Sequence, residues 1–255
     1  MKRELILPHQ WAEKEIKIAL VGCGGTGAEI LDELYRIDLL LKKLGGEGFH
    51  VDAFDPDTVS SANLGRSRFW PCDLDFHKSE VLITRLNSYG GTQWRYINEK
   101  FDAKYCEHYD LIITAADNPE IRAQIGEIEW ASEEETLLWL DCGNGAHDGN
   151  VILGHLCCDD EQRYIPNVYD LYPMLSTMIV KNEPSCSTEA AILKQDYGIN
   201  RSVAREGANL LWQLFRHGRL DHHGSYIDIK AGTVCPLLID EDQWAVYGFQ
   251  SAQAS

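Results

Sequence analysis

A glycine-rich turn near the N-terminus is the first segment whose residue types could do chemistry. Residues 22–27 read Gly-Cys-Gly-Gly-Thr-Gly, which fits the pattern G-x-G-x-x-G. Such glycines permit a tight turn and let phosphate oxygens approach backbone N–H groups at the start of a helix. The pattern therefore predicts a nucleotide-binding turn, and a glycine-rich turn without a ligand is the alternative interpretation.

An acidic residue after the next apolar run is the second signal. The spacing from Gly27 to Asp55 is longer than the usual spacing of about 20 residues, and the glycine-rich insertion at 45–48 accounts for the extra residues. A carboxylate at this point would accept hydrogen bonds from both ribose hydroxyls. The alternative is that Asp55 and Asp57 belong only to a proline-containing turn.

The residues of the loop after Asp55 distinguish an ATP-binding site from a nicotinamide-binding site. Asn63, Arg66 and Arg68 lie on this loop, and Lys78 begins the next helical stretch. Cations and an amide can hold a triphosphate and stabilise the charge that moves onto a leaving pyrophosphate. A dehydrogenase does not need them, so a nicotinamide-dependent oxidoreductase is a disfavoured alternative.

Asp117 and Asn118 come directly after an apolar run at 110–115. The carboxyl end of a strand is where an α/β sheet presents ligand-binding groups, and a carboxylate facing a triphosphate is a natural ligand for Mg²⁺. Any single Asp or Arg is more often solvated than functional. The order of all these residues together is what favours a magnesium-ATP site.

The elements that position these residues alternate between strand-like and helical patterns. Short apolar runs predict strands, and apolar residues at helical spacing predict helices between them. This alternation predicts an α/β fold, a Rossmann-like, doubly wound, mostly parallel sheet with helices on both faces. The predicted strands are 16–21, 49–54, 94–97, 110–115, 137–140 and 150–156, and the predicted helices are 26–41, 79–89 and 119–128.

The character of the chain changes after this alternation. Residues 157–187 are polar and read as a crossover loop. Residues 188–255 predict helices at 188–197 and 200–215, followed by a short strand near 226–229. No repeat and no linker separates two units, so we expect one domain over 1–255 with its nucleotide-binding core at 16–156.

Composition restricts the partners and the compartment. The chain has 23 Lys+Arg against 40 Asp+Glu, a net charge of −17, and the acid excess is greater in its second half. This balance disfavours nucleic acids and acidic membranes, because phosphate binding needs clustered cations. No apolar run approaches the roughly 20 residues of a membrane span. The 8 scattered cysteines, without a signal peptide or a Cys-x-x-Cys pair, predict reduced thiols in a cytoplasmic protein and no structural zinc.

The combined motifs resemble the ThiF/MoeB/HesA family, the adenylating fold shared with ubiquitin-activating enzymes. The resemblance covers about 16–156 and rests on the glycine turn, the run 55–68, Lys78, and Asp117-Asn118 with Arg122. A narrower resemblance, to the ThiF-related proteins of PRTRC cassettes of mobile bacterial elements, rests on the segments 184–190, 195–200 and 211–218.

This resemblance implies ATP-dependent and Mg²⁺-dependent adenylation of the C-terminal glycine of a small ubiquitin-like β-grasp protein, by a homodimer. Asp55 would bind ribose, while Asn63, Arg66 and Lys78 would hold phosphates and stabilise the transition state. Asp117 would hold Mg²⁺. The other nucleotide-binding positions would be Gly22, Gly24, Gly25, Gly27, Asp57 and Asn118. The attacking carboxylate is already an anion, so no general base is needed.

A second chemical step would need a thiol. Cys186 precedes a predicted helix whose dipole would lower its pKa, at a place where relatives carry a thioester or persulfide cysteine. An unreactive thiol is the alternative. Relatives also supply an arginine from the N-terminus to the neighbouring subunit, and Arg3 is the only arginine before the glycine turn.

Two further functions stay open. One is a catalytically inactive nucleotide-binding adaptor that recruits a ubiquitin-like partner, which the joint presence of Arg66, Lys78 and Asp117 disfavours. The other is adenylation of a different acceptor such as tRNA, which the charge of −17 disfavours.

Overall fold

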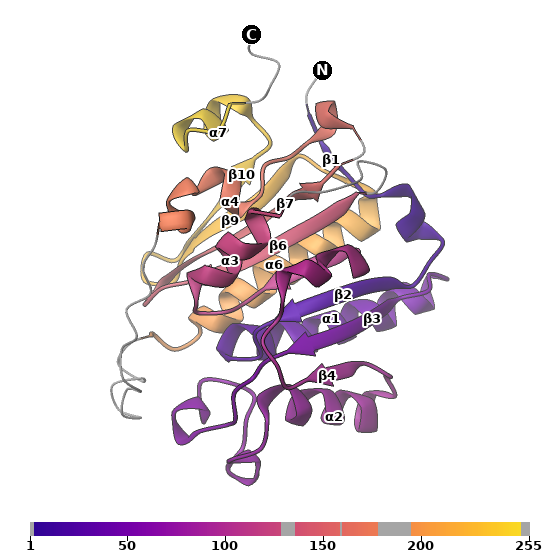
Figure 1. Ribbon diagram of the computed structural model, residues 1–255, viewed down its shortest axis with the longest axis vertical. Coiled ribbons are helices and arrows are strands. Elements are labelled where there is room, and N and C mark those ends of the chain that lie inside the picture. Colours follow the sequence, from indigo (N-terminus) through magenta and orange to yellow (C-terminus); the bar gives the residue numbers. More distant parts are fainter. Residues whose placement is uncertain (1–2, 129–135, 159, 178–194, 251–255) are drawn as a thin grey trace.

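The computed structural model describes residues 3–128, 136–158, 160–177 and 195–250 (Figure 1). An eight-stranded sheet of order β10-β9-β7-β6-β5-β2-β3-β4 forms the centre of this described part. The strands of the sheet are β2 (Ile16–Val21), β3 (Phe49–Phe54), β4 (Arg95–Ile97), β5 (Leu111–Thr114), β6 (Leu137–Asn144), β7 (Asp148–Cys157), β9 (His222–Asp228) and β10 (Thr233–Leu238). A separate pair joins β1 (Leu5–Ile6) to β8 (Arg219–Leu220).

The half of the sheet that carries the motifs is parallel. β2 pairs in parallel with β3 and β5, and the same direction continues to β4 and β6. All four residues of β5 are buried, as expected for strands covered on both faces. The predicted α/β, doubly wound fold is thereby confirmed, and the strands predicted at 16–21 and 49–54 have the observed bounds.

The other half of the sheet is antiparallel, which the strand–helix alternation did not predict. β7 follows β6 after a short turn and runs antiparallel to it. A turn of this length cannot carry the crossover that a parallel pair needs. β9 and β10 continue the antiparallel half, so the strand expected near 226–229 is part of the main sheet rather than an appendage.

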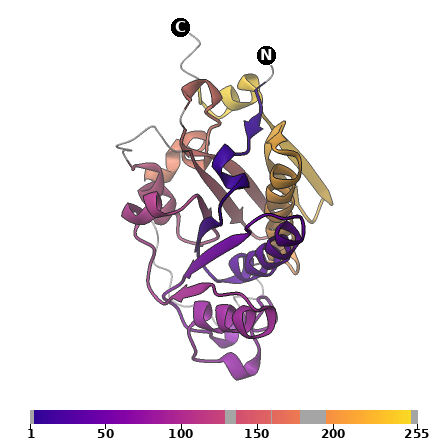
Figure 2. The ribbon, with the colours of Figure 1, turned by 90° about the vertical axis from the view of Figure 1, so that its right-hand side faces the viewer.

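Helices cover both faces of the sheet. Figure 2 shows α1 (Gly25–Lys43) and α6 (Ile199–His217) on one face, and α3 (Pro119–Gly126) and α4 (Val168–Leu171) on the other. α6 buries an apolar stripe that includes Val203, Leu211 and Leu214, which positions it against β6, β7 and α1. The remaining α-helices are α2 (Lys78–Gly90) and α7 (Glu241–Val246). Short 3₁₀ helices span His9–Ala12, Ser61–Asn63, Pro71–Asp73, Ala103–His108, Glu161–Arg163 and Pro173–Thr177.

The predicted crossover loop is partly helical. Its described part contains α4 and two 3₁₀ helices, and it packs back onto β7, where the Asn167 side chain donates to the His155 carbonyl at 2.8 Å. The helix expected over 188–197 lies mostly outside the described residues, whereas the one expected over 200–215 is α6. Cys186 also lies outside the described residues.

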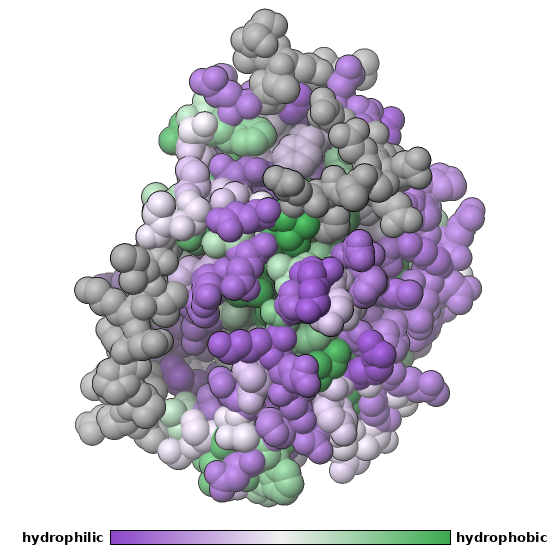
Figure 3. All heavy atoms as spheres, in the orientation of Figure 1, coloured by the Kyte–Doolittle hydropathy of each residue, from purple (hydrophilic) through white to green (hydrophobic). Residues whose placement is uncertain are grey.

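Polar side chains cover most of the face seen in Figure 3, with apolar ones in the centre and in smaller groups at the upper left and the lower end. Among the described residues, none of the helices has the length and apolar character needed to cross a bilayer.

Candidate nucleotide-binding site

A cavity of about 360 Å³ opens at the carboxyl ends of β2, β3 and β5. Neighbouring parallel strands end at the same edge of a sheet, so the residues that follow them converge there. Phe54, Phe101 and Ile121 give the cavity an apolar wall. The predicted site residues that line it are Gly22, Gly24, Asp55, Asp57, Lys78, Asp117 and Asn118.

The glycine turn joins β2 to α1 directly below this cavity. Gly22 has a φ of 96°, which disfavours any residue with a side chain. A Cβ on Gly27 would lie 1.9 Å from the Gly22 carbonyl oxygen, so the first turn of α1 packs against the glycine turn. Nothing lies within 4 Å of the corresponding Cβ on Gly24. The start of α1, with its unpaired N–H groups, is therefore open toward an anion.

Asp55 links the turn to the end of β3. Its side chain is buried, and its two oxygens accept the backbone N–H groups of Cys23 at 2.7 Å and of Asp57 at 2.9 Å. Burial raises the pKa of Asp55, an effect that the nearby Lys78 ammonium opposes. A carboxylate has about four acceptor positions, so Asp55 can still accept from a ligand hydroxyl in the cavity.

Lys78 brings a positive charge to the cavity. It is the first residue of α2, and both its ends contact Asp57: its N–H donates to the Asp57 carbonyl at 3.0 Å and its ammonium lies 2.8 Å from the carboxylate. The Lys78 side chain is nearly buried while that of Asp57 is 67% exposed. The ammonium is thus held in place while its partner remains in water.

Asp117 and Asn118 follow β5 at the opposite wall. Asn118 caps α3, because its side-chain oxygen accepts the Glu120 N–H at 2.8 Å. Asp117 is exposed and also lines a second cavity of about 360 Å³, beside Arg122 and Tyr172. Mg²⁺ in nucleotide sites is held by one or two carboxylates together with phosphates and water, and Asp117 fits that role. Among the described residues, no group of three His, Cys, Asp or Glu side chains is arranged to hold a metal.

Comparison with known proteins decides the family. The sequence profile of the ThiF family matches residues 4–153, more than half of the chain. The chain belongs to the ThiF family. Among curated proteins, none matches the sequence significantly.

Solved structures show the same fold at low sequence identity. Escherichia coli MccB with ATP has a TM-score of 0.54 at 14% identity, over 96% of this chain and 67% of that one. MccB with MccA-N7isoASN gives 0.55 at 15% identity, over 88% and 64%. PaaA gives 0.60 at 13% identity, over 90% and 65%. The chain thus spans about two thirds of the length of these structures.

Gly25 and Gly27 of the predicted ThiF family site lie in the glycine turn beside the first cavity, and the side chains of Asn63 and Arg66 do not line it. Asn63 accepts the Ser60 N–H at 2.9 Å and stabilises the 3₁₀ turn at Ser61–Asn63. Arg66 lines a third cavity of about 310 Å³, where it donates to the Gln195 side chain at 3.2 Å. Their assignment to the phosphates stays a prediction.

Arg122 lies in the interior of this ThiF family chain. It is buried, and its guanidinium donates to Asp141 at 2.6 Å and to the Ala116 carbonyl at 2.8 Å. In the sequence, Arg122 belongs to the Asp117-Asn118 motif on which the family resemblance rests. Asp141 ends an apolar run, and no local pattern shows that the two residues pair.

The buried thiols near the site are poor nucleophiles. Cys23 and Cys142 are both buried, and desolvation raises the pKa of each thiol well above its ordinary range. Both therefore stay protonated at neutral pH. Any thiol chemistry in this ThiF family chain falls to another cysteine, and the candidate Cys186 lies outside the described residues.

Proposed function

We propose that this chain uses ATP and Mg²⁺ to adenylate a carboxylate, namely the C-terminal glycine of a small ubiquitin-like β-grasp protein. The observation that carries the proposal is the convergence of Asp55, Lys78 and Asp117 with the start of α1 on one cavity. Membership of the ThiF family supports the adenylating reaction.

Each side chain of this cavity has a defined task in the proposal. Asp55 accepts hydrogen bonds from the ribose, while the apolar wall with Phe101 receives the base. The N–H groups at the start of α1 and the Lys78 ammonium bind phosphate oxygens. Asp117 would hold Mg²⁺, which neutralises phosphate charge when it is bound.

The reaction is a displacement at phosphorus. An oxygen of the substrate carboxylate attacks the α-phosphorus, the bond from that phosphorus to the bridging oxygen breaks, and pyrophosphate leaves with the electron pair. Lys78 and the start of α1 stabilise the negative charge that grows on the phosphates. No proton is transferred, so the chain contributes position and electric field rather than a base.

The neighbouring cavity offers the substrate a route to the same point. Ala116 and Asp117 line both it and the nucleotide cavity, and Asn144, Tyr172 and Met174 form part of its wall. An extended glycine tail in this second cavity would bring its carboxylate beside Asp117. The proposed enzyme acts as a homodimer. In a second step the Cys186 thiolate would attack the activated carbonyl carbon, and AMP would leave as the thioester forms.

ATP–pyrophosphate exchange tests the proposed reaction. Exchange should require a β-grasp protein with an intact C-terminal glycine and should vanish in Asp117→Ala. Lys43→Met, at the far end of α1, is the matched control and should leave exchange unchanged. ATP binding without exchange for any partner would support the adaptor function instead, and exchange driven by tRNA would support the other acceptor. Conjugates that persist in Cys186→Ala would remove that cysteine from the reaction.

A further inference from the structure

The third cavity, of about 310 Å³, adjoins the glycine turn from the other side. Gly24 lines the nucleotide cavity, and the next residue, Gly25, packs against the Asn200 side chain that lines the third cavity. Asn200 is fixed there, because its oxygen accepts from Thr26 at 3.0 Å and from Asn144 at 3.3 Å. Both cavities therefore flank the start of α1, one on each side of the glycine turn.

Two arginines from distant segments line this third cavity. Arg66 comes from the loop after β3, and Arg201 comes from the first turn of α6. Asp196 is the acid among the lining residues, so the two guanidinium groups outnumber it. The two guanidinium groups and the N-terminus of α6 can both bind an anion, with Glu29 and Asp196 as the acids beside them.

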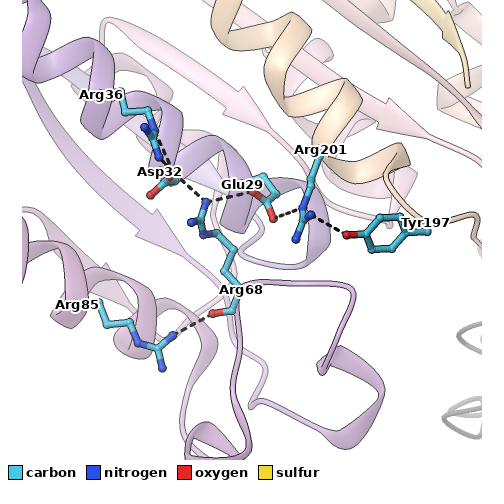
Figure 4. Close-up of polar contacts among 7 residues, drawn as sticks. All are labelled: Glu29, Asp32, Arg36, Arg68, Arg85, Tyr197 and Arg201. Carbon is cyan, nitrogen blue, oxygen red and sulfur yellow. Dashed lines mark hydrogen bonds and ion pairs between the residues drawn. The ribbon is translucent and has the colours of Figure 1, made fainter. Parts of the chain in front are cut away.

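Arg201 is held in place but open to solvent. Its Nε donates to Glu29 at 3.2 Å and its Nη1 donates to the Tyr197 hydroxyl at 3.0 Å, while 56% of its side chain remains exposed (Figure 4). These contacts engage two of the three nitrogens of the guanidinium and orient it. A guanidinium that is oriented in advance loses less entropy when it binds phosphate.

Glu29 connects this arginine to the loop of Arg66. Its second carboxylate oxygen accepts from Arg68 at 3.2 Å, and the same Arg68 nitrogen lies 2.8 Å from Asp32 (Figure 4). Glu29 is 8% exposed, so the two ion pairs are better shielded from water than surface pairs. One carboxylate on α1 thus ties α6 and the loop after β3 to the same helix.

We propose that Arg201 binds the β- and γ-phosphate end of the nucleotide beside Arg66, with Glu29 as the residue that positions it. The proposal rests on the proposed function only in placing the nucleoside in the first cavity. Arg3, the sequence candidate for an added arginine, contacts Glu241 in α7 of its own chain at 3.4 Å. Arg201 supplies that positive charge from within the same chain.

Calorimetric titration with magnesium-ATP and with AMP tests the assignment. Arg201→Gln should weaken ATP binding about tenfold and change AMP binding less than twofold, because AMP lacks the two terminal phosphates. Arg205→Gln, one turn further along the exposed side of α6, is the matched control and should change neither. Glu29→Gln should weaken ATP binding in the wild type, and by a smaller factor in the Arg201→Gln background.

The contrary outcomes are distinct from one another. Equal losses for ATP and AMP, or an equal effect of Arg205→Gln, would overturn the role of Arg201. An additive Glu29→Gln effect would overturn the positioning role of Glu29. A wild-type chain that binds ATP without catalysing exchange would overturn the proposed reaction but not the Arg201 assignment, because the titration measures binding alone. A chain that binds neither nucleotide would overturn both.

Discussion

The Asp55 carboxylate accepts the backbone N–H of Cys23 at 2.7 Å, so the acid at the end of β3 is bonded directly to the glycine turn after β2. The predicted ribose-binding group and the predicted phosphate-binding turn are therefore parts of one rigid unit. Any displacement of Asp55 also displaces the turn, which couples nucleotide affinity to the stability of this edge of the sheet.

Asp55→Asn should weaken both ATP binding and the fold. The amide can accept only on its oxygen, so its NH₂ group would face one of the two backbone N–H groups that Asp55 now satisfies. Leaving such a buried donor unpaired costs about 1–3 kcal/mol in free energy of unfolding. Urea unfolding and ATP titration would check this, and an unchanged unfolding midpoint would contradict the coupling.

Gly27→Ala should be much more disruptive than Gly24→Ala. The added methyl at Gly27 would lie 1.9 Å from the Gly22 oxygen, and backbone on both sides would have to move. We expect a loss of about 3 kcal/mol in free energy of unfolding. At Gly24 nothing lies within 4 Å, so the loss should stay within about 0.5 kcal/mol. Equal losses in urea unfolding would show that the turn relaxes more than this packing allows.

Lys78→Met should reduce exchange with little effect on stability. The Lys78 ammonium lines the cavity and is predicted to bind the phosphates. Removing one such group that stabilises a transition state lowers the rate about 100-fold. Its partner Asp57 is 67% exposed, so their ion pair contributes at most about 1 kcal/mol. Exchange kinetics and thermal unfolding should be measured together. A large drop in melting temperature with normal exchange would make Lys78 a structural residue.

The buried pair of Arg122 and Asp141 should behave as a unit. Asp141→Leu would leave the Arg122 guanidinium buried without its carboxylate, at a cost of about 3–5 kcal/mol. The double variant Arg122→Met with Asp141→Leu removes both charges and should recover most of that stability. Chemical unfolding of the two variants checks this, and losses that simply add would show that the residues act independently.

Stability should fall on acidification because of His223. This residue is fully buried, its Nε2 accepts the Trp244 indole N–H at 2.9 Å, and burial lowers its pKa from 6.5 to about 4. In the unfolded chain His223 binds a proton below about pH 6.5, whereas in the folded chain it stays unprotonated down to about pH 4. The free energy of unfolding therefore falls as the pH drops through this window. The loss reaches about 3 kcal/mol. Urea unfolding from pH 7 to pH 4 measures it, and His223→Gln, which cannot titrate, should flatten the profile.

The sequence by itself determined the fold class and the residues of the first cavity. Gly22, Asp55 and Asp117 each follow a short apolar run, and parallel strands end at a common edge. The local pattern of strand, turn and helix was therefore sufficient to bring these residues together. The order of these motifs also indicated the ThiF family, and the profile match confirms it.

Only the tertiary structure decided what depends on contacts between distant segments. Nothing in the local pattern shows that β7, β9 and β10 extend the sheet in the antiparallel sense, because direction is set by turn length and pairing partner. Likewise Arg122 turns inward to Asp141, and Arg201 meets Glu29 across 172 positions of the chain. A charged residue has the same appearance in the sequence whether it contacts a ligand, a buried partner or water, and packing alone distinguishes the three.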